Sequence, residues 1–135
     1  AETSLYEVRR GKEMSVKALA TLAGNFLRSN WTMFLISPIL GGVDKGGNQV
    51  YSLDIGGAVM LDNYVATGSG MQLAYGVLED IYEEGMTNKE ATTVAAHAIK
   101  SASQRDTASG DGMCLAVITE DGVDIKGHKD FKAFL

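Results

Sequence analysis

Apolar residues recur at helical spacing along the first part of the chain. The stretch "TSLYEVRRG" is typical of the end of a helix, with basic residues in its last turn and Gly11 just past it. Ser15 is placed to cap a second helix, and Gly24 within that helix indicates close contact with a neighbouring segment. The apolar face of this second helix comprises Leu19, Leu22, Ala23, Phe26 and Leu27.

The period changes from helix to strand at Thr32. The run "MFLISPIL" is typical of a strand, and Pro38 within it indicates a sheet edge or a bulge. The next run, "QVYSLDI", alternates and predicts one face made of Gln49, Tyr51, Leu53 and Ile55. "AVMLDNYVA" predicts a third strand. Glycine-rich turns at 45–48 and 56–57 join the three strands into an antiparallel meander.

Helical periodicity returns in the second half of the chain. One predicted helix ends at Gly85 and carries the stripe Ala74, Val77, Leu78, Ile81 and Tyr82. Another opens with a capping box, Thr87 followed by Glu90 three residues later. Its apolar face is predicted to contain Ala91, Val94, Ala95, Ala98, Ile99 and Ala102, a set rich in small side chains that favour close packing.

The last predicted elements are two strands. "MCLAVIT" is apolar without alternation, which predicts a strand covered on both faces with Cys114 buried in it. Asp121-Gly122 predicts a hairpin turn into "VDI". The order is therefore two helices, three strands, two helices and two strands. This order predicts an α+β fold with antiparallel sheet in a single domain spanning residues 1–135.

Charge and cysteine content narrow the function classes. The formal net charge is −5, and no basic stripe is present that would bind nucleic acid. No apolar run approaches the length of a membrane span, and no secretory signal is visible. With one cysteine, no intrachain disulfide is possible, so a cytoplasmic location is expected.

Two polar motifs are candidates for chemistry. Gly68-Ser69-Gly70 lies between a strand and a helix, where a tight turn with Ser69 as an N-cap is favoured over an anion site. The third glycine of a dinucleotide site and the lysine of a nucleotide loop are absent. At the end of the last helix, Asp106 and Ser109 are three residues apart and can face one direction, as local capping or as a site.

Metal and cofactor sites are not expected. His97 and His128 have no cysteine or second histidine at ligand spacing. We therefore predict neither a cofactor nor a metal for this chain.

Several segments together resemble the proteasome beta subunit, especially the archaeal type. They occur in the family's order across nearly the whole chain: "LYEVRRGKEMSVKALATLAGNFL", "ILGGVD", "VYSLD", "ATGSGMQLAYGVLE", "QRDTASGDG" and "LAVITEDGV". The resemblance implies an N-terminal-nucleophile hydrolase fold, a four-layer αββα antiparallel sandwich, here incomplete at the N-terminus. The chain would be the C-terminal two-thirds of such a subunit.

The resemblance also implies a function. The intact subunit would be a threonine-type endopeptidase of the proteasome core particle, with an N-terminal threonine as nucleophile and its own amine as base. Asp106, Ser109 and Ser69 match the family's supporting polar residues around that amine. The implied partners are other beta subunits in rings, alpha-subunit rings, an ATPase unfoldase and unfolded polypeptide, with no nucleic acid and no membrane.

The departure from the family concerns the nucleophile. The family's threonine, a second aspartate and a lysine lie in a segment that would precede Ala1, and Thr3 belongs to a helix. This chain alone is therefore expected to be inactive. The alternatives are a non-catalytic structural ring subunit of the same assembly, or a small-ligand or phosphate-binding domain that uses Gly68-Ser69-Gly70.

Overall fold

The computed structural model describes residues 2–29 and 36–128 and divides the chain into two compact units, Ala1–Asn63 and Tyr64–Leu135. The predicted order of two helices, three strands, two helices and two strands is confirmed. Both sheets are antiparallel, so the α+β class is confirmed as well. The single-domain expectation stays a prediction.

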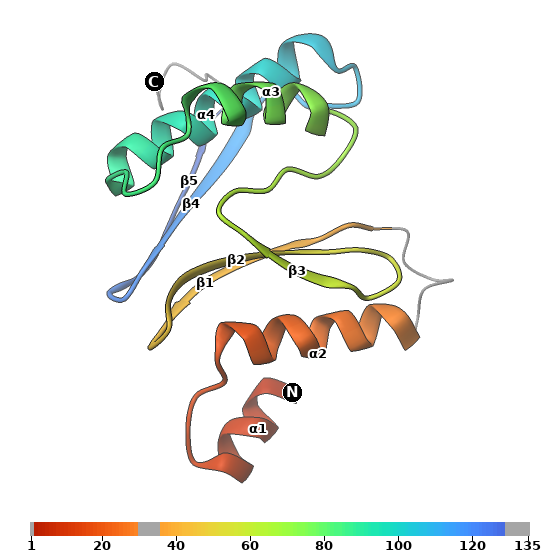
Figure 1. Cartoon of the computed structure of the whole chain (residues 1–135), viewed down its shortest axis with the longest axis vertical. Helices are drawn as coiled ribbons and strands as arrows, with labels where there is room; N and C mark the ends of the chain where they lie inside the picture. The colour runs from red at the N-terminus through yellow and green to blue at the C-terminus, as the bar shows by residue number, and fades with distance from the viewer. Residues whose placement is uncertain (1, 30–35, 129–135) are drawn as a thin grey trace. The chain divides into compact units, whose positions relative to one another are not determined.

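Unit one consists of helices α1 (Glu2–Arg10) and α2 (Val16–Ser29) and a sheet of strands β1 (Ile39–Asp44), β2 (Gly47–Leu53) and β3 (Val59–Asp62). The strands pair in the order β1-β2-β3, with Leu40 opposite Tyr51 and Tyr51 opposite Leu61. Helix α2 runs along one face of this sheet (Figure 1). The buried core between them comprises Val16, Ala20, Leu27, Tyr51 and Leu53.

Glycine lets α2 approach the sheet closely. Gly24 is buried, and a Cβ atom there would lie 2.8 Å from both the Gly57 carbonyl oxygen and a methyl group of Val59. Gly57 itself has φ +79°, in the left-handed region. The predicted close contact at Gly24 is therefore confirmed, and its neighbour is the turn between β2 and β3.

Local signals place the ends of α1 and α2. Gly11 has φ +64° and its N–H donates to the Glu7 carbonyl, which ends α1. The Ser15 hydroxyl accepts a hydrogen bond from the Ala18 N–H at 3.2 Å, so Ser15 caps α2 as predicted.

The strand boundaries in unit one differ from the prediction at three points. The predicted third strand, residues 58–66, is shortened to β3, Val59–Asp62. Ile36, Ser37 and Pro38 are not in a strand, and β1, an edge strand, begins just after the proline; residues 32–35 of the predicted run lie outside the described residues. Ile55 is also outside the sheet. Asp54 accepts a hydrogen bond from the Ala58 N–H at 2.8 Å and forms a turn there, so β2 ends at Leu53.

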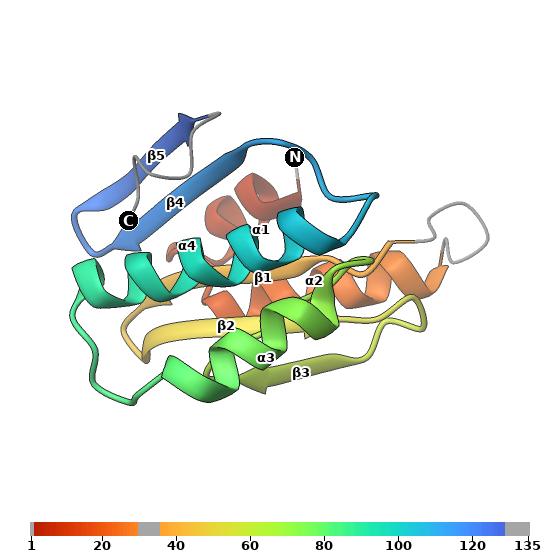
Figure 2. The ribbon, with the colours of Figure 1, turned by 90° about the horizontal axis from the view of Figure 1, so that it is seen from above.

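Unit two consists of helices α3 (Met71–Ile81) and α4 (Asn88–Arg105) and a hairpin of strands β4 (Met113–Thr119) and β5 (Gly122–His128). Helices α3 and α4 lie side by side (Figure 2), and their shared core comprises Ala74, Leu78, Val94 and Ala98. The capping box at α4 is confirmed: Thr87 accepts from the Glu90 N–H, and Glu90 accepts from the Thr87 N–H.

Burial in this unit differs from the prediction in α4 and in β4. Of the predicted α4 face, Val94, Ala98 and Ala102 are buried, but Ala91, Ala95 and Ile99 are exposed. Ala96 is buried as well, because the helix contacts β4 in addition to α3. Strand β4 alternates between covered and exposed residues, because in the described part of the unit only α4 covers it. Cys114 is therefore exposed.

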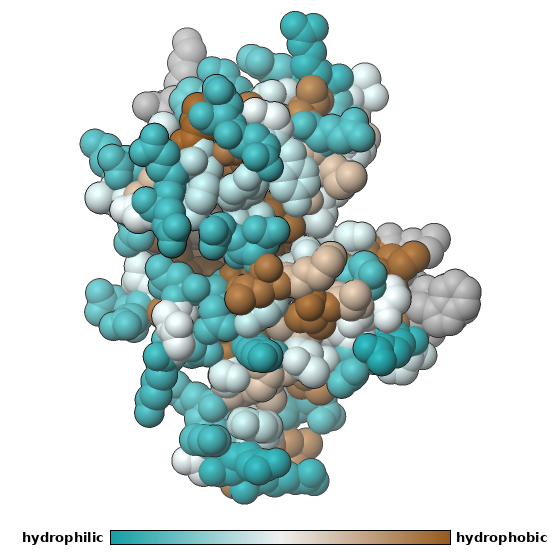
Figure 3. All heavy atoms as spheres, viewed as in Figure 1, coloured by the Kyte–Doolittle hydropathy of each residue, from teal (hydrophilic) through white to brown (hydrophobic). Residues whose placement is uncertain are grey.

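The outer face of the β4–β5 hairpin is apolar and exposed. Ile118 is 38% exposed, and Val123 and Ile125 of β5 are 60% and 65% exposed. Figure 3 shows apolar areas among hydrophilic ones on the face of the molecule that it presents. Within the described residues, no helix has the length and apolar character needed to cross a bilayer.

A matched pair of glycine substitutions tests the packing of α2. Gly24→Ala should lower the free energy of unfolding by about 1–3 kcal/mol, because the added methyl group collides with the β2–β3 turn. Gly76→Ala, at an exposed position of α3 with nothing within 4 Å of the new atom, should instead raise it by about 0.5–1 kcal/mol. Urea denaturation of the two variants measures both effects. A stabilising Gly24→Ala would contradict the close contact.

Candidate functional site

Asp106 and Ser109 lie where α4 ends. Asp106 is the C-cap, with extended backbone angles, and its N–H donates to the Ala102 carbonyl at 2.8 Å. The chain then turns, and the Ser109 N–H donates to the Asp106 carbonyl at 3.2 Å. This turn brings the Ser109 hydroxyl to 2.7 Å from Asp106 Oδ2, to which it donates. The two side chains therefore face one direction, as their spacing predicts.

Ser69 reaches the same carboxylate from the loop before α3. Gly68 has φ +97°, and this left-handed turn brings Ser69 toward the end of α4. The Ser69 hydroxyl donates to Asp106 Oδ2 at 2.5 Å, across 37 positions of sequence. The interpretation of Ser69 as an N-cap is wrong, because Gly70 occupies the N-cap position and no side chain caps α3.

These three side chains form a polar cluster, Ser69–Asp106–Ser109, that presents hydrogen-bond acceptors. An ionised carboxylate can only accept, so both hydroxyl hydrogens must point at Asp106 Oδ2. Asp106 Oδ1 accepts the Ala108 N–H at 3.3 Å. The lone pairs of the two hydroxyl oxygens can therefore accept hydrogen bonds from a donor outside the cluster. With one negative charge and no proton left to donate, the cluster is complementary to a cation that carries N–H groups.

The hydrogen bonds favour the charged form of Asp106. The pKa of Asp106 is lowered from its ordinary value of 3.8. The hydrogen bond from the Ser69 hydroxyl is the largest cause and that from the Ser109 hydroxyl the second, while partial desolvation acts in the opposite direction. Ser69 is exposed, whereas Asp106 and Ser109 are half-buried, so the cluster is open to solvent on the Ser69 side.

His97 and Cys114 take no part in the cluster. His97 is exposed in the middle of α4, and Cys114 is exposed on β4. Over residues 2–29 and 36–128, no group of three or more histidine, cysteine, aspartate or glutamate side chains is placed to hold a metal ion.

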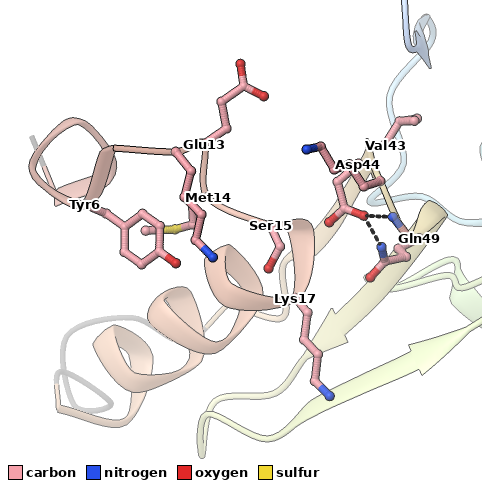
Figure 4. Close-up of a pocket in the computed structure, with 11 residues that line it drawn as sticks. Tyr6, Glu13, Met14, Ser15, Lys17, Val43, Asp44 and Gln49 are labelled. Atoms are coloured by element: carbon pink, nitrogen blue, oxygen red, sulfur yellow. Dashed lines mark hydrogen bonds between the residues drawn. The ribbon is translucent and has the colours of Figure 1, made fainter. Parts of the chain in front are cut away.

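Sequence reasoning missed the role of Asp44, which lines a cavity of about 750 Å³ in unit one (Figure 4). Asp44 accepts from the Val16 N–H at 2.7 Å, the Gly46 N–H at 2.6 Å and Gln49 Nε2 at 2.9 Å. The Val16 bond, followed by the Gly46 bond, lowers the Asp44 pKa. This carboxylate therefore joins the start of α2 to the β1–β2 turn, a structural role. No local signal could show it, since Val16 is 28 positions away.

The lowered pKa of Asp106 has a testable consequence. Because folding lowers this pKa, its stabilising contribution is present above the ordinary aspartate value and is lost as pH falls through the folded value. NMR titration of the Asp106 carboxyl should give a pKa below 3.8. Ser69→Ala should raise that pKa more than Ser109→Ala does.

Ser103→Ala is the matched control, because the Ser103 hydroxyl donates within α4 to the Lys100 carbonyl and does not contact Asp106. It should leave the Asp106 pKa unchanged. An Asp106 pKa at or above the ordinary value in the unaltered chain would show that the two hydroxyl bonds do not form in solution.

Comparison with known proteins places this chain in a family. Residues 1–118 match the family model described as "Proteasome subunit". The chain is 62% identical over 135 residues to "Proteasome subunit beta 1" of Haloterrigena turkmenica, covering all of this chain and 55% of that protein. It is 63% identical over 131 residues to "Proteasome subunit beta" of Natrialba magadii, covering 97% of this chain and 54% of that protein.

A third relative, "Proteasome subunit beta" of Natronomonas pharaonis, is 58% identical over 135 residues, all of this chain and 56% of that protein. The chain thus spans about half the length of the curated relatives that it matches. The family match covers all of unit one and residues 64–118 of unit two, and it includes the positions of Ser69, Asp106 and Ser109. On this evidence the chain belongs to the proteasome subunit family, among its beta subunits.

Proposed function

We propose that this chain is part of a catalytic beta subunit of the proteasome core particle, a threonine-type endopeptidase. The observation that carries the proposal is the direction of the hydrogen bonds in the cluster. Ser69 and Ser109 both donate to Asp106, so only acceptor lone pairs and one negative charge face outward. An N-terminal threonine needs such surroundings for its amine.

The proposed mechanism uses the terminal amine as the base. The amine takes the proton of the threonine hydroxyl as the oxygen attacks the peptide carbonyl, and it becomes an ammonium group. The hydroxyl oxygens of Ser69 and Ser109 accept N–H bonds from that ammonium, and Asp106 offsets its charge. The cluster lies at the ends of α3 and α4, so these acceptors are held by rigid elements.

The fold and the partners follow from the same proposal. Paired helices and antiparallel sheets are the components of the N-terminal-nucleophile hydrolase sandwich, with its four αββα layers. The relatives bear the name proteasome subunit beta, which supports assembly with other beta subunits and with alpha-subunit rings. An ATPase unfoldase would supply unfolded polypeptide to that assembly in the cytoplasm.

The two alternatives account less well for the cluster. A purely structural ring subunit would have no need of two hydroxyls donating to one half-buried carboxylate. A phosphate site at Gly68-Ser69-Gly70 conflicts with charge, because Asp106 Oδ2 lies 2.5 Å from the Ser69 hydroxyl and would repel the anion.

Peptide hydrolysis tests the proposal. The isolated 135-residue chain should not cleave fluorogenic peptides, whereas the full-length product of its gene, assembled into rings, should. In that assembly, Asp106→Asn should lower kcat/KM by about 100-fold or more, the scale of losing one preorganised electrostatic partner of the transition state. Ser109→Ala should lower it by about 10-fold, the effect of one hydrogen bond to a charged group.

Ser103→Ala in the same assembly is the control and should retain full activity, because Ser103 bonds only within α4. Hydrolysis by the isolated chain that a threonine-directed inhibitor blocks would refute the predicted need for a further segment. A full-length protein with no threonine exposed by processing would refute the catalytic interpretation and favour the structural subunit.

A further inference from the structure

Gly70 lies directly against the polar cluster. It is buried, and a Cβ atom at this position would lie 2.8 Å from Ala102 Cβ, 3.0 Å from Ser109 Oγ and 3.3 Å from Asp106 Oδ2. The first of these distances is well inside van der Waals contact between two carbon atoms. A side chain at position 70 would therefore collide with Ala102 of α4 and press tightly against Ser109 and Asp106, two of the three members of the cluster.

Position 70 requires glycine because there is no room for a side chain, and not because of its backbone conformation. Gly70 has φ −86° and ψ 6°, values that residues with side chains also adopt. Gly68, two positions earlier, has φ +97°, and a Cβ atom there would meet nothing within 4 Å. At Gly68 the backbone conformation, and not a lack of space, is therefore the reason for glycine. The two glycines on either side of Ser69 thus have different roles. Gly68 allows the chain to turn, and Gly70 allows the loop to approach α4 closely.

Ala102 is the residue of α4 that faces Gly70 most closely. It is 7% exposed in the last turn of α4, and its carbonyl accepts the Asp106 N–H that ends the helix. On the other side, the Gly70 carbonyl accepts from the Leu73 and Ala74 N–H groups, each at 3.1 Å, and so begins α3. The contact therefore packs the backbone at the start of α3 against the Ala102 side chain in the last turn of α4.

We propose that Gly70 and Ala102 are positioning residues: their close contact sets the distance between the Ser69 hydroxyl and the Asp106 carboxylate. They act through Ser69 and Asp106, since a shift of the loop by a few tenths of an ångström would lengthen the 2.5 Å bond that joins them. The link to catalysis rests on the proposed function, but the link to the hydrogen bond does not.

The test combines Gly70→Ala with Ala102→Gly. In the full chain, Gly70→Ala should raise the Asp106 pKa toward its ordinary value, because Ser69 is pushed away from the carboxylate. Adding Ala102→Gly removes the nearest obstructing atom, so the double variant should recover part of the lowering. The recovery should be incomplete, since Ser109 Oγ still lies 3.0 Å from the new methyl group.

Gly76→Ala is the control and should leave the Asp106 pKa unchanged, because nothing lies within 4 Å of the added atom. If Gly70→Ala lowers the melting temperature but leaves the Asp106 pKa at the wild-type value, the contact is only structural and the proposal is wrong. An absence of recovery in the double variant would also overturn it. The double variant serves as the test by itself where Gly70→Ala does not fold.

Activity of the assembled full-length protein provides a separate readout. Gly70→Ala should lower kcat by about 10-fold or more with a smaller change in KM, and Ala102→Gly should restore part of it. A full-length protein without peptidase activity would refute the proposed function, while the pKa pattern would still decide whether Gly70 and Ala102 position the cluster.

Discussion

One carboxylate oxygen, Asp106 Oδ2, receives both hydroxyl hydrogen bonds of the polar cluster, and the organisation of unit two around the site depends on it. Through Ser69 it joins the loop before α3, and through Ser109 it closes the turn after α4. A neutral side chain at position 106 would not impose the same direction on both hydroxyls. Charge on this oxygen thus determines which groups the cluster can offer to an outside molecule.

Close approach of backbone segments recurs in both units. In unit one, Gly24 of α2 lies against the β2–β3 turn at Gly57. In unit two, Gly70 lies against Ala102 of α4. In each case a missing side chain allows a helix to contact a loop at a distance that alanine would not permit. The cost in helix propensity at Gly24 is offset because the close approach allows the buried contacts of Leu27 and Tyr51.

Features with a local cause were predictable from the sequence. Ser15 and the Thr87–Glu90 capping box act within a few residues, and so does the turn that pairs Asp106 with Ser109. The bond from Ser69 to Asp106 spans 37 positions, and no periodicity or motif in the chain indicates it. Only the resemblance to a family placed those two residues together, and local reasoning favoured the N-cap that the structure contradicts.

The errors have a common physical origin in tertiary context. Strand β2 stops at Leu53 because Asp54 bonds to a turn, although Ile55 continues the apolar alternation. Strand β4 has a sequence suited to burial on both faces, yet in the described residues only α4 covers it. The pattern of apolar and polar residues shows which faces of a strand can be buried. The helices and strands that pack against it determine which face is buried.

The position of the cluster at two helix ends also bears on local motion. Terminal turns are ordinarily the first parts of a helix to open, and each opens independently of other helices. Here the last turn of α4, closed by the Asp106 N–H, and the first turn of α3, begun at Gly70, are cross-linked by the Ser69 hydroxyl. Fraying of either end must break that cross-link, so the bond opposes the opening of both ends, and the acceptor site persists for as long as both stay closed.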